Sequence, residues 1–147
     1  MYDGGCECGA IRYRLATAPF FVNCCHCRQC QKITGSAFAI NAMIEGDRIV
    51  LMQGEPVVAE GGTVRCPNCA TLLWATHRMF GDKIVFLRAG TLDESETLTP
   101  DAHFFVRSKH RWITLPEGAR SFETLPGADD VLMTGAARQR LDAALAS

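Results

Sequence analysis

Eight cysteines are the residues of this 147-residue chain whose types and spacing could do chemistry. They fall into three groups: Cys6 and Cys8; Cys24, Cys25, Cys27 and Cys30; and Cys66 and Cys69. Pairs spaced C-x-C or C-x-x-C can turn both sulfur atoms toward one ion. Zinc takes four such ligands in closed structural sites, and three plus an open position in many catalytic sites. The spacing therefore predicts metal sites built from thiolates.

Two partitions of the cysteines into sites agree with this spacing. In the first, the two C-x-x-C pairs form one zinc-ribbon-like site, made of Cys27, Cys30, Cys66 and Cys69. In the second, a four-thiolate site and a three-thiolate site are made of Cys6, Cys8, Cys66 and Cys69 and of Cys25, Cys27 and Cys30. Spacing favours the second partition only modestly, and both stay open at this point.

Strand geometry bears on Cys24, which both partitions leave out. Alternate side chains of an extended segment share a face. Cys25 and Cys27 would then point one way, while Cys24 and His26 would point the other. We therefore expect Cys24 to be a small buried apolar residue rather than a ligand.

The composition is that of an ordinary globular domain, with 48% hydrophobic and 21% charged residues. A formal net charge of −1 argues against nucleic acid as a partner. The sequence shows neither a secretory signal nor an apolar run long enough for a membrane helix, so we expect a cytoplasmic protein without a membrane partner. Because thiols stay reduced in the cytoplasm, metal binding is favoured over disulfides.

Short strands are expected to position these cysteines. Residues 10–15 alternate apolar and charged, which is the period of a half-buried strand. Further short runs lie at 20–22, 36–44, 48–52, 72–76, 83–87, 103–106 and 112–114, with Gly, Pro or Asp between them. This pattern predicts a mainly β protein. Only the tail from Ala136 has helical periodicity, with Thr134 as its N-cap.

Three segments carry more specific motifs: GCECGAIRY at 5–13, CHCRQCQK at 25–32 and RCPNC at 65–69. In this order they resemble the glutathione-dependent formaldehyde-activating enzyme family, which includes the domain of centromere protein V. The resemblance extends over most of the chain, to about residue 126. One departure is Ala70, which stands where the family usually has glycine after the later C-x-x-C.

The resemblance implies the second partition, with two zinc ions per chain. The structural zinc would be held by Cys6, Cys8, Cys66 and Cys69, and the active-site zinc by Cys25, Cys27 and Cys30. The implied fold is the β-tent, in which small antiparallel sheets are pinned together by the structural zinc. The implied activity is that of a carbon–sulfur lyase, which joins formaldehyde to glutathione to give S-hydroxymethylglutathione or reverses that step.

The resemblance also frames the domain organisation. We divide the chain into a zinc-binding domain, residues 1–127, and a C-terminal extension with a short helix, residues 128–147. The extension packs on the domain or on a second copy in a homodimer, and both arrangements stay open. An alternative to the enzyme is a non-catalytic, zinc-stabilised module that binds a thiol or a protein. The three-cysteine set favours the enzyme, because a purely structural role needs no open metal position.

Overall fold

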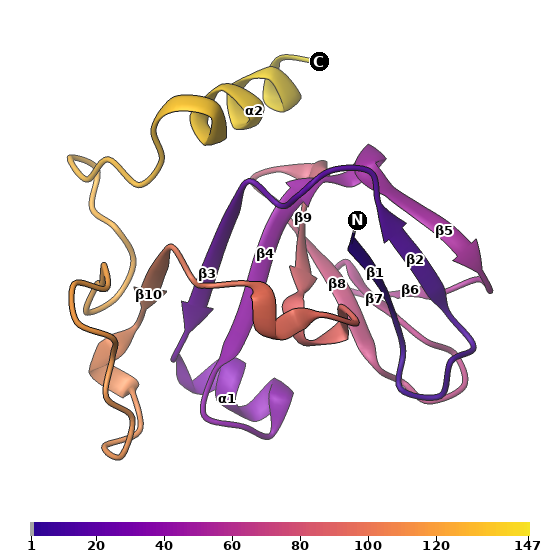
Figure 1. The fold of residues 1–147 in the computed structure, drawn as a ribbon, viewed down its shortest axis with the longest axis horizontal. Coiled ribbons are helices and arrows are strands. Elements are labelled where there is room, and N and C mark those ends of the chain that lie inside the picture. Colours follow the sequence, from indigo (N-terminus) through magenta and orange to yellow (C-terminus); the bar gives the residue numbers. More distant parts are fainter. Residues whose placement is uncertain (1) are drawn as a thin grey trace.

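Two β-sheets form the body of the protein, as the computed structural model of residues 2–147 shows (Figure 1). The smaller sheet has the order β1-β2-β5, with β1 (Tyr2–Gly5), β2 (Arg12–Leu15) and β5 (Ile49–Gln53). The larger sheet has the order β10-β3-β4-β9-β8-β7-β6. Its strands are β3 (Phe21–Cys25), β4 (Ala39–Glu45), β6 (Val57–Ala59), β7 (Thr63–Arg65), β8 (Leu72–His77), β9 (Gly81–Arg88) and β10 (Ala102–Phe104).

The strand pairing confirms the mainly β fold that the sequence predicts. Within residues 2–147, neighbouring strands pair antiparallel except β10 and β3, which are parallel. Short 3-10 turns join several strands: η1 (Gly46–Arg48), η2 (Ala89–Thr91), η3 (Ser95–Thr97) and η4 (Val106–Ser108). In the described part of the chain, no helix has the length and apolar character that crossing a membrane requires.

The central strands of the larger sheet pack on both faces, because side chains alternate along a strand and each face meets a separate core. One face packs on the smaller sheet, where Val22 and Leu87 join a core that includes Tyr13. The opposite face carries a second core with Phe21 and Met43, which C-terminal residues cover. This double burial explains why every residue of β3 is buried.

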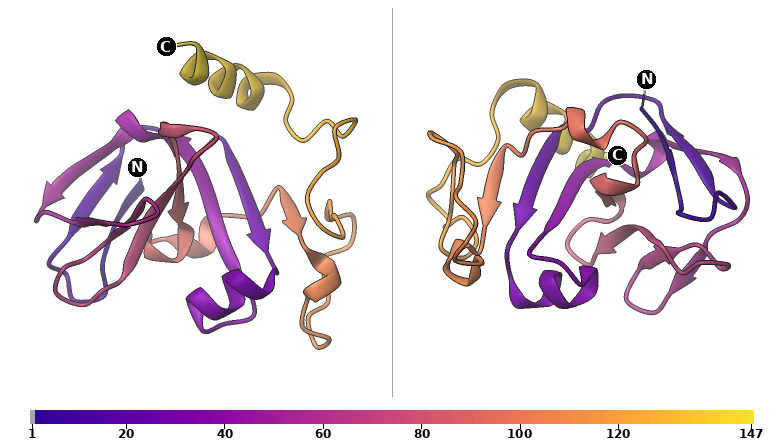
Figure 2. Two further views of the ribbon diagram at one scale, coloured as in Figure 1. Left: turned by 180° about the vertical axis from the view of Figure 1, so that it is seen from behind. Right: turned by 60° about the horizontal axis from the view of Figure 1, so that its bottom comes forward.

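Two helices, α1 (Arg28–Thr34) and α2 (Gly135–Ala146), lie at opposite ends of β3 and β4 (Figures 1 and 2). The segment between β10 and α2, orange to yellow in the figures, runs from the level of α1 to that of α2. The helix predicted for the tail is confirmed, and Thr134 is its N-cap residue. Ala137 and Leu141 pack on the second core, so in this structure α2 covers its own chain.

The structure differs from the sequence prediction at two places. Helix α1 begins within the second group of cysteines, because the Cys27 sulfur caps it by accepting from the Cys30 N–H at 3.3 Å. Gly35 ends the helix in the left-handed conformation. The helix is too short for its apolar residues to show a helical period in the sequence. Residues 112–114, predicted as a strand, form a turn and coil with Trp112 exposed.

Arg140 fastens α2 to the larger sheet. Its guanidinium donates to the two carboxylate oxygens of Glu45 at 2.8 and 2.5 Å and to the Ala18 carbonyl at 2.7 Å. It also lies over the ring of Phe20, 5.3 Å from the centroid. Burial is the largest single influence on the pKa of Glu45 and acts to raise it, but the hydrogen bonds and charge of Arg140, together with a backbone hydrogen bond and the charge of Arg48, combine to lower the pKa.

We predict that Arg140→Ala loosens α2 and lowers the free energy of unfolding by about 2 kcal/mol at pH 7. Because the folded-state pKa of Glu45 is lowered, the pair stabilises the protein above the ordinary glutamate pKa of about 4.3. That contribution is lost as the pH falls through the lowered folded value. Denaturant unfolding of wild type and variant at pH 7 and pH 3 should therefore show a smaller difference at pH 3.

The control for this test is Arg138→Ala, which removes an exposed ion pair to Asp142 within the same helix. An exposed i,i+4 pair contributes about 0.3–0.5 kcal/mol, so this variant should change stability little at either pH. A destabilisation by Arg140→Ala that is as large at pH 3 as at pH 7 would assign its effect to packing alone.

Candidate functional site

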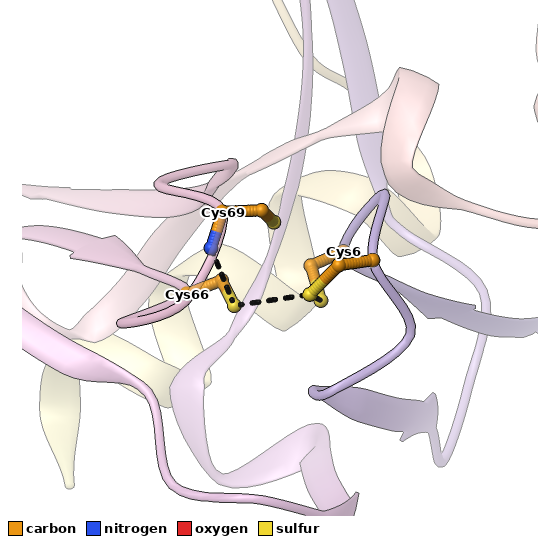
Figure 3. A group of neighbouring side chains, drawn as sticks. Cys6, Cys66 and Cys69 are labelled. Atoms are coloured by element: carbon orange, nitrogen blue, oxygen red, sulfur yellow. Dashed lines mark hydrogen bonds between the residues drawn. The ribbon is translucent and has the colours of Figure 1, made fainter.

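Four cysteines from the two sheets meet in one cluster. Cys6 and Cys8 follow β1 of the smaller sheet, and Cys66 and Cys69 lie in the turn between β7 and β8 of the larger sheet. Figure 3 shows Cys6 facing Cys66 and Cys69 from the opposite chain segment. The four sulfur atoms lie within 4.8 Å of one another. The cluster therefore joins the two sheets.

The geometry of this cluster fits a tetrahedral metal ion. The Cys8 sulfur lies 3.6 Å from the Cys6 sulfur and 3.8 Å from the Cys66 sulfur. Four sulfurs bound to zinc at about 2.3 Å would be about 3.8 Å apart. Ile11 N donates to the Cys6 sulfur, and Asn68 Nδ2 to the Cys8 sulfur, both at 3.2 Å. Such donors support thiolate ligands, and four ligands close a tetrahedral site.

The turn that carries Cys66 ends in a strained residue. Ala70 has a φ of 60°, in the left-handed region that favours glycine. Its N–H donates to the Cys66 carbonyl at 3.0 Å, and its own carbonyl accepts from Arg65 at 3.2 Å. These contacts hold Ala70 in a conformation that its Cβ disfavours.

A second cluster joins the end of β3 to the start of α1. Cys25 ends the strand, Cys27 caps the helix and Cys30 lies in its first turn, with the three sulfurs within 4.8 Å of one another. Cys25 is buried, whereas Cys27 and Cys30 are partly exposed. Three thiols with an accessible side fit a metal ion that keeps one coordination position open. The structure thus brings the cysteines together in sets of four and three.

Hydrogen bonding shifts the pKa values of Cys25 and Cys30 in opposite directions. The contact with Cys30 lowers the pKa of the Cys25 thiol to about 6, although burial acts in the opposite direction. The same contact, together with burial, raises the pKa of Cys30. Of Cys25 and Cys30, Cys25 is therefore the thiol that forms a thiolate more readily.

A third set of donor atoms, which the sequence prediction does not assemble, lies on the opposite face of β3. The Cys24 sulfur is 3.5 Å from His26 Nε2, which is 3.1 Å from His103 Nδ1 on β10. Burial, and next the nearby His103, lower the pKa of His26 to about 4, so this ring is neutral at pH 7. All three side chains are buried, so a substrate has no access to them. Strand parity already places Cys24 with His26, but His103 comes from a distant strand without a local signal.

A polar row lies next to Cys25 on the face of the larger sheet. Asn23 shares this face, pairs with Asn41 on β4, and Asn41 in turn pairs with Arg88 on β9. Arg88 can only donate, and it hydrogen-bonds Asn41 Oδ1. This contact orients the Asn41 amide, whose Nδ2 donates to Asn23 Oδ1 at 3.2 Å. Because the Asn23 side-chain oxygen accepts this bond, the N–H groups of this amide remain available to a ligand. The series of hydrogen bonds also polarises these N–H groups.

Basic side chains gather beside α1. Gln31 fastens the helix to the loop after β10, because its Nε2 donates to the Ser108 carbonyl at 2.9 Å. Its Oε1 accepts from Arg28 and lies 3.2 Å from His110 Nε2. These contacts bring the basic run 107–111 to the helix that carries Cys30. Cationic groups in this place suit carboxylate groups of a ligand.

A cavity of about 680 Å³ opens beside Cys25. Its floor is the sheet face that carries Asn23, Cys25 and Asn41, and its opposite wall comes from residues between 125 and 141. A larger cavity, of about 900 Å³, lies between α2 and Trp74, but its described lining residues include no cysteine. The smaller cavity is therefore the one associated with the cysteine chemistry.

Fold and site together define a mainly β protein with one closed and one open cysteine cluster. Over residues 1–108 the chain matches the family described as glutathione-dependent formaldehyde-activating enzyme, and it belongs to that family. This match confirms the resemblance drawn from the three motifs.

Individual proteins are also similar to this chain. A Halomonas elongata protein, provisionally named glutathione-dependent formaldehyde-activating enzyme, is 26% identical over 128 residues, covering 78% of this chain and 81% of the relative. A crystal structure of a Rhodobacter sphaeroides protein matches with a TM-score of 0.50 at 18% identity, covering 67% of this chain and 91% of that one. This second likeness supports the fold alone.

We predict that Ala70→Gly raises the free energy of unfolding by about 0.5–1 kcal/mol, because glycine adopts a positive φ without Cβ strain. Ala59→Gly is the matched control, since Ala59 lies exposed in the extended strand β6 and glycine there should destabilise. Denaturant titration of both variants measures the two signs. Destabilisation of similar size by both changes would show that Ala70 carries no strain.

Proposed function

We propose that this protein joins a small thiol to an aldehyde, or reverses that reaction, at Cys25, Cys27 and Cys30. The observation that carries the proposal is the accessible three-thiol cluster beside a cavity. Membership of the family supports glutathione as the thiol and activation of formaldehyde as the type of chemistry. The reaction class is that of a carbon–sulfur lyase.

Zinc is the metal we propose for both clusters, with two ions per chain. The structural ion would be held by Cys6, Cys8, Cys66 and Cys69, and the active-site ion by Cys25, Cys27 and Cys30. A zinc ion with three thiolate ligands keeps an open position and lowers the pKa of a thiol that binds there. The cysteines are free thiols, which suits the reducing cytoplasm where we expect the protein to act.

The proposed addition balances without an oxidant or a reductant. The thiol loses its proton, and the thiolate sulfur forms a bond to the carbonyl carbon. The π electrons of the carbonyl move onto its oxygen, which takes up a proton to give a hemithioacetal. The reverse reaction returns thiol and aldehyde.

Asn23 is the residue we assign to the reacting oxygen. Its amide lies on the same sheet face as Cys25, two residues along β3, and lines the same cavity. A preoriented N–H donor stabilises the charge that develops on oxygen during the addition. The cavity would hold the aldehyde beside Cys25, close to a thiol bound at the cluster, and this proximity contributes further to the rate.

The carboxylates of glutathione would bind on the α1 side of the cluster. Arg28 and the basic run 107–111 lie there, fastened by Gln31. The thiol would then approach from the basic side and the aldehyde from the cavity side. This arrangement separates the two substrates by their charge.

We predict that the purified protein contains two zinc ions per chain by elemental analysis. Cys27→Ser should remove one ion and leave the fold intact, because the four-cysteine cluster is untouched. Cys6→Ser should remove the other ion, whereas a zinc-ribbon-like site would keep all of its metal in this variant. Cys24→Ser is the matched control and should retain both ions. One ion per chain, unaffected by Cys27→Ser, would overturn the two-site proposal.

We predict that Asn23→Leu lowers kcat for adduct formation by about 100-fold, with little change in KM for the thiol, because the donor acts on developing charge. Exchange of the aldehyde between free and adduct forms, followed by NMR, measures the rate. Asn23→Asp keeps the shape but replaces the donor by an acceptor, so it should lose at least as much. A full rate in Asn23→Leu, with metal content unchanged, would remove Asn23 from the reaction.

A further inference from the structure

The cavity beside Cys25 is larger and more apolar than formaldehyde, with one carbon and one oxygen, requires. Its volume of about 680 Å³ lies in the range of sites that hold drug-sized ligands. Apolar and aromatic side chains line most of it, including Met43, Phe80, Phe86, Phe104, Leu132 and Leu141. The lining therefore indicates a ligand with a hydrocarbon part.

Strand register orders the floor of this cavity from polar to apolar. Cys25 stands at one end of β3, and the pair Asn23 and Asn41 forms the next row on the same face. The row after that contains Met43 and Phe86, which pair between β4 and β9. Successive rows are about 6.6 Å apart. A ligand that extends from Cys25 past the two amides reaches thioether and aromatic side chains.

The C-terminal segment is held in place as the opposite wall. Arg120 donates to the carbonyls of Val131 and Leu132, both at 2.8 Å. Leu141 of α2 packs on the second core, and Arg140 ties the same helix to the sheet. This wall lies beyond residues 1–108, so the family match alone does not describe it. The cavity is thus shaped in part by a segment outside the family match.

Exposed apolar side chains surround the mouth of the cavity. Leu125, Val131 and Met79 line it with exposed fractions of 58, 66 and 73%. Exposed apolar groups that gather around a hollow mark a binding site rather than a random surface. They would lose contact with water when a hydrocarbon chain enters.

Charged residues at the mouth are mainly acidic. Asp129 and Asp130 line the cavity there. Among the described residues, Arg138 is the one arginine that lines the cavity, and it is paired with Asp142. This charge disfavours the carboxylates of glutathione, which find cationic partners beside α1 instead. The apolar cavity is therefore available to the other reactant, the aldehyde.

We propose that this cavity binds the hydrocarbon substituent of the aldehyde, so that the protein acts on alkyl or aromatic aldehydes and their glutathione adducts. The inference rests on the proposed function. In the bound adduct the sulfur lies at the Cys25 end, the oxygen lies at Asn23, and the hydrocarbon lies among Met43, Phe86 and the C-terminal wall.

Two stable thioethers test this assignment by calorimetric titration of the metal-loaded full chain. S-hexylglutathione and S-methylglutathione share the peptide and differ only in the length of the apolar group. We expect S-hexylglutathione to bind on the order of 100-fold more tightly, because its additional methylenes are buried in the cavity. The reading is an affinity, so it does not depend on turnover.

A matched pair of valines locates the binding. Val131→Asp places a charge at the mouth and should weaken S-hexylglutathione binding about tenfold while leaving S-methylglutathione binding unchanged. Val58→Asp changes a valine of similar exposure on β6, which lines the larger cavity instead, and should alter neither affinity. Both residues are exposed, so neither change should prevent folding.

Each outcome of the titrations decides a different proposal. Equal affinity for the two thioethers overturns the apolar pocket and leaves the proposed function standing. A preference for S-hexylglutathione that Val58→Asp removes and Val131→Asp retains overturns the location. Failure of both thioethers to bind overturns glutathione as the thiol, and the inference about the aldehyde falls with it.

Discussion

The meeting of four sulfur atoms from two sheets is the constraint on which the rest of the structure depends. Cys6 and Cys66 belong to the core between the sheets as well as to the cluster, so the apolar packing of the sheets also positions two of the four sulfur atoms. A three-stranded sheet of such short strands buries little surface by itself. Its position is set because the loop after β1 must reach the turn after β7. The opposite face of the larger sheet then remains available for the proposed site.

That other face is where the proposed chemistry takes place, and β3 controls it. Because β3 is buried on both sides, its residues cannot move independently, and the cysteine at its end inherits a fixed position. Helix α1 then turns Cys30 back toward Cys25 within a few residues. Rigid support of this kind places ligands more precisely than a mobile loop does. The C-terminal segment adds the remaining wall and leaves the cysteines in place.

Much of this arrangement could be predicted from local patterns. Alternation in residues 10–15 and the helical spacing from Ala136 correspond to β2 and α2, since both signals reflect burial of one face. Local patterns do not predict helix α1, because its N-cap residue is Cys27, which the sequence pattern indicates as a metal ligand. The polar row joins three strands, with Asn23, Asn41 and Arg88 each on a different one. No spacing along the sequence therefore predicts it. The order of the three motifs identified the family, whereas the pairing register of the strands brings the residues of the site together.

The contrast between Cys24 and Cys25 shows how register assigns chemistry. The two are adjacent and identical in type, yet β3 turns them to opposite faces. Burial raises the pKa of the Cys24 thiol to about 12, so it stays a thiol against His26. Cys25 faces the cavity, where the contact with Cys30 lowers its pKa to about 6. A shift of one residue along β3 would exchange these environments, so the strand register determines which sulfur can serve as a ligand.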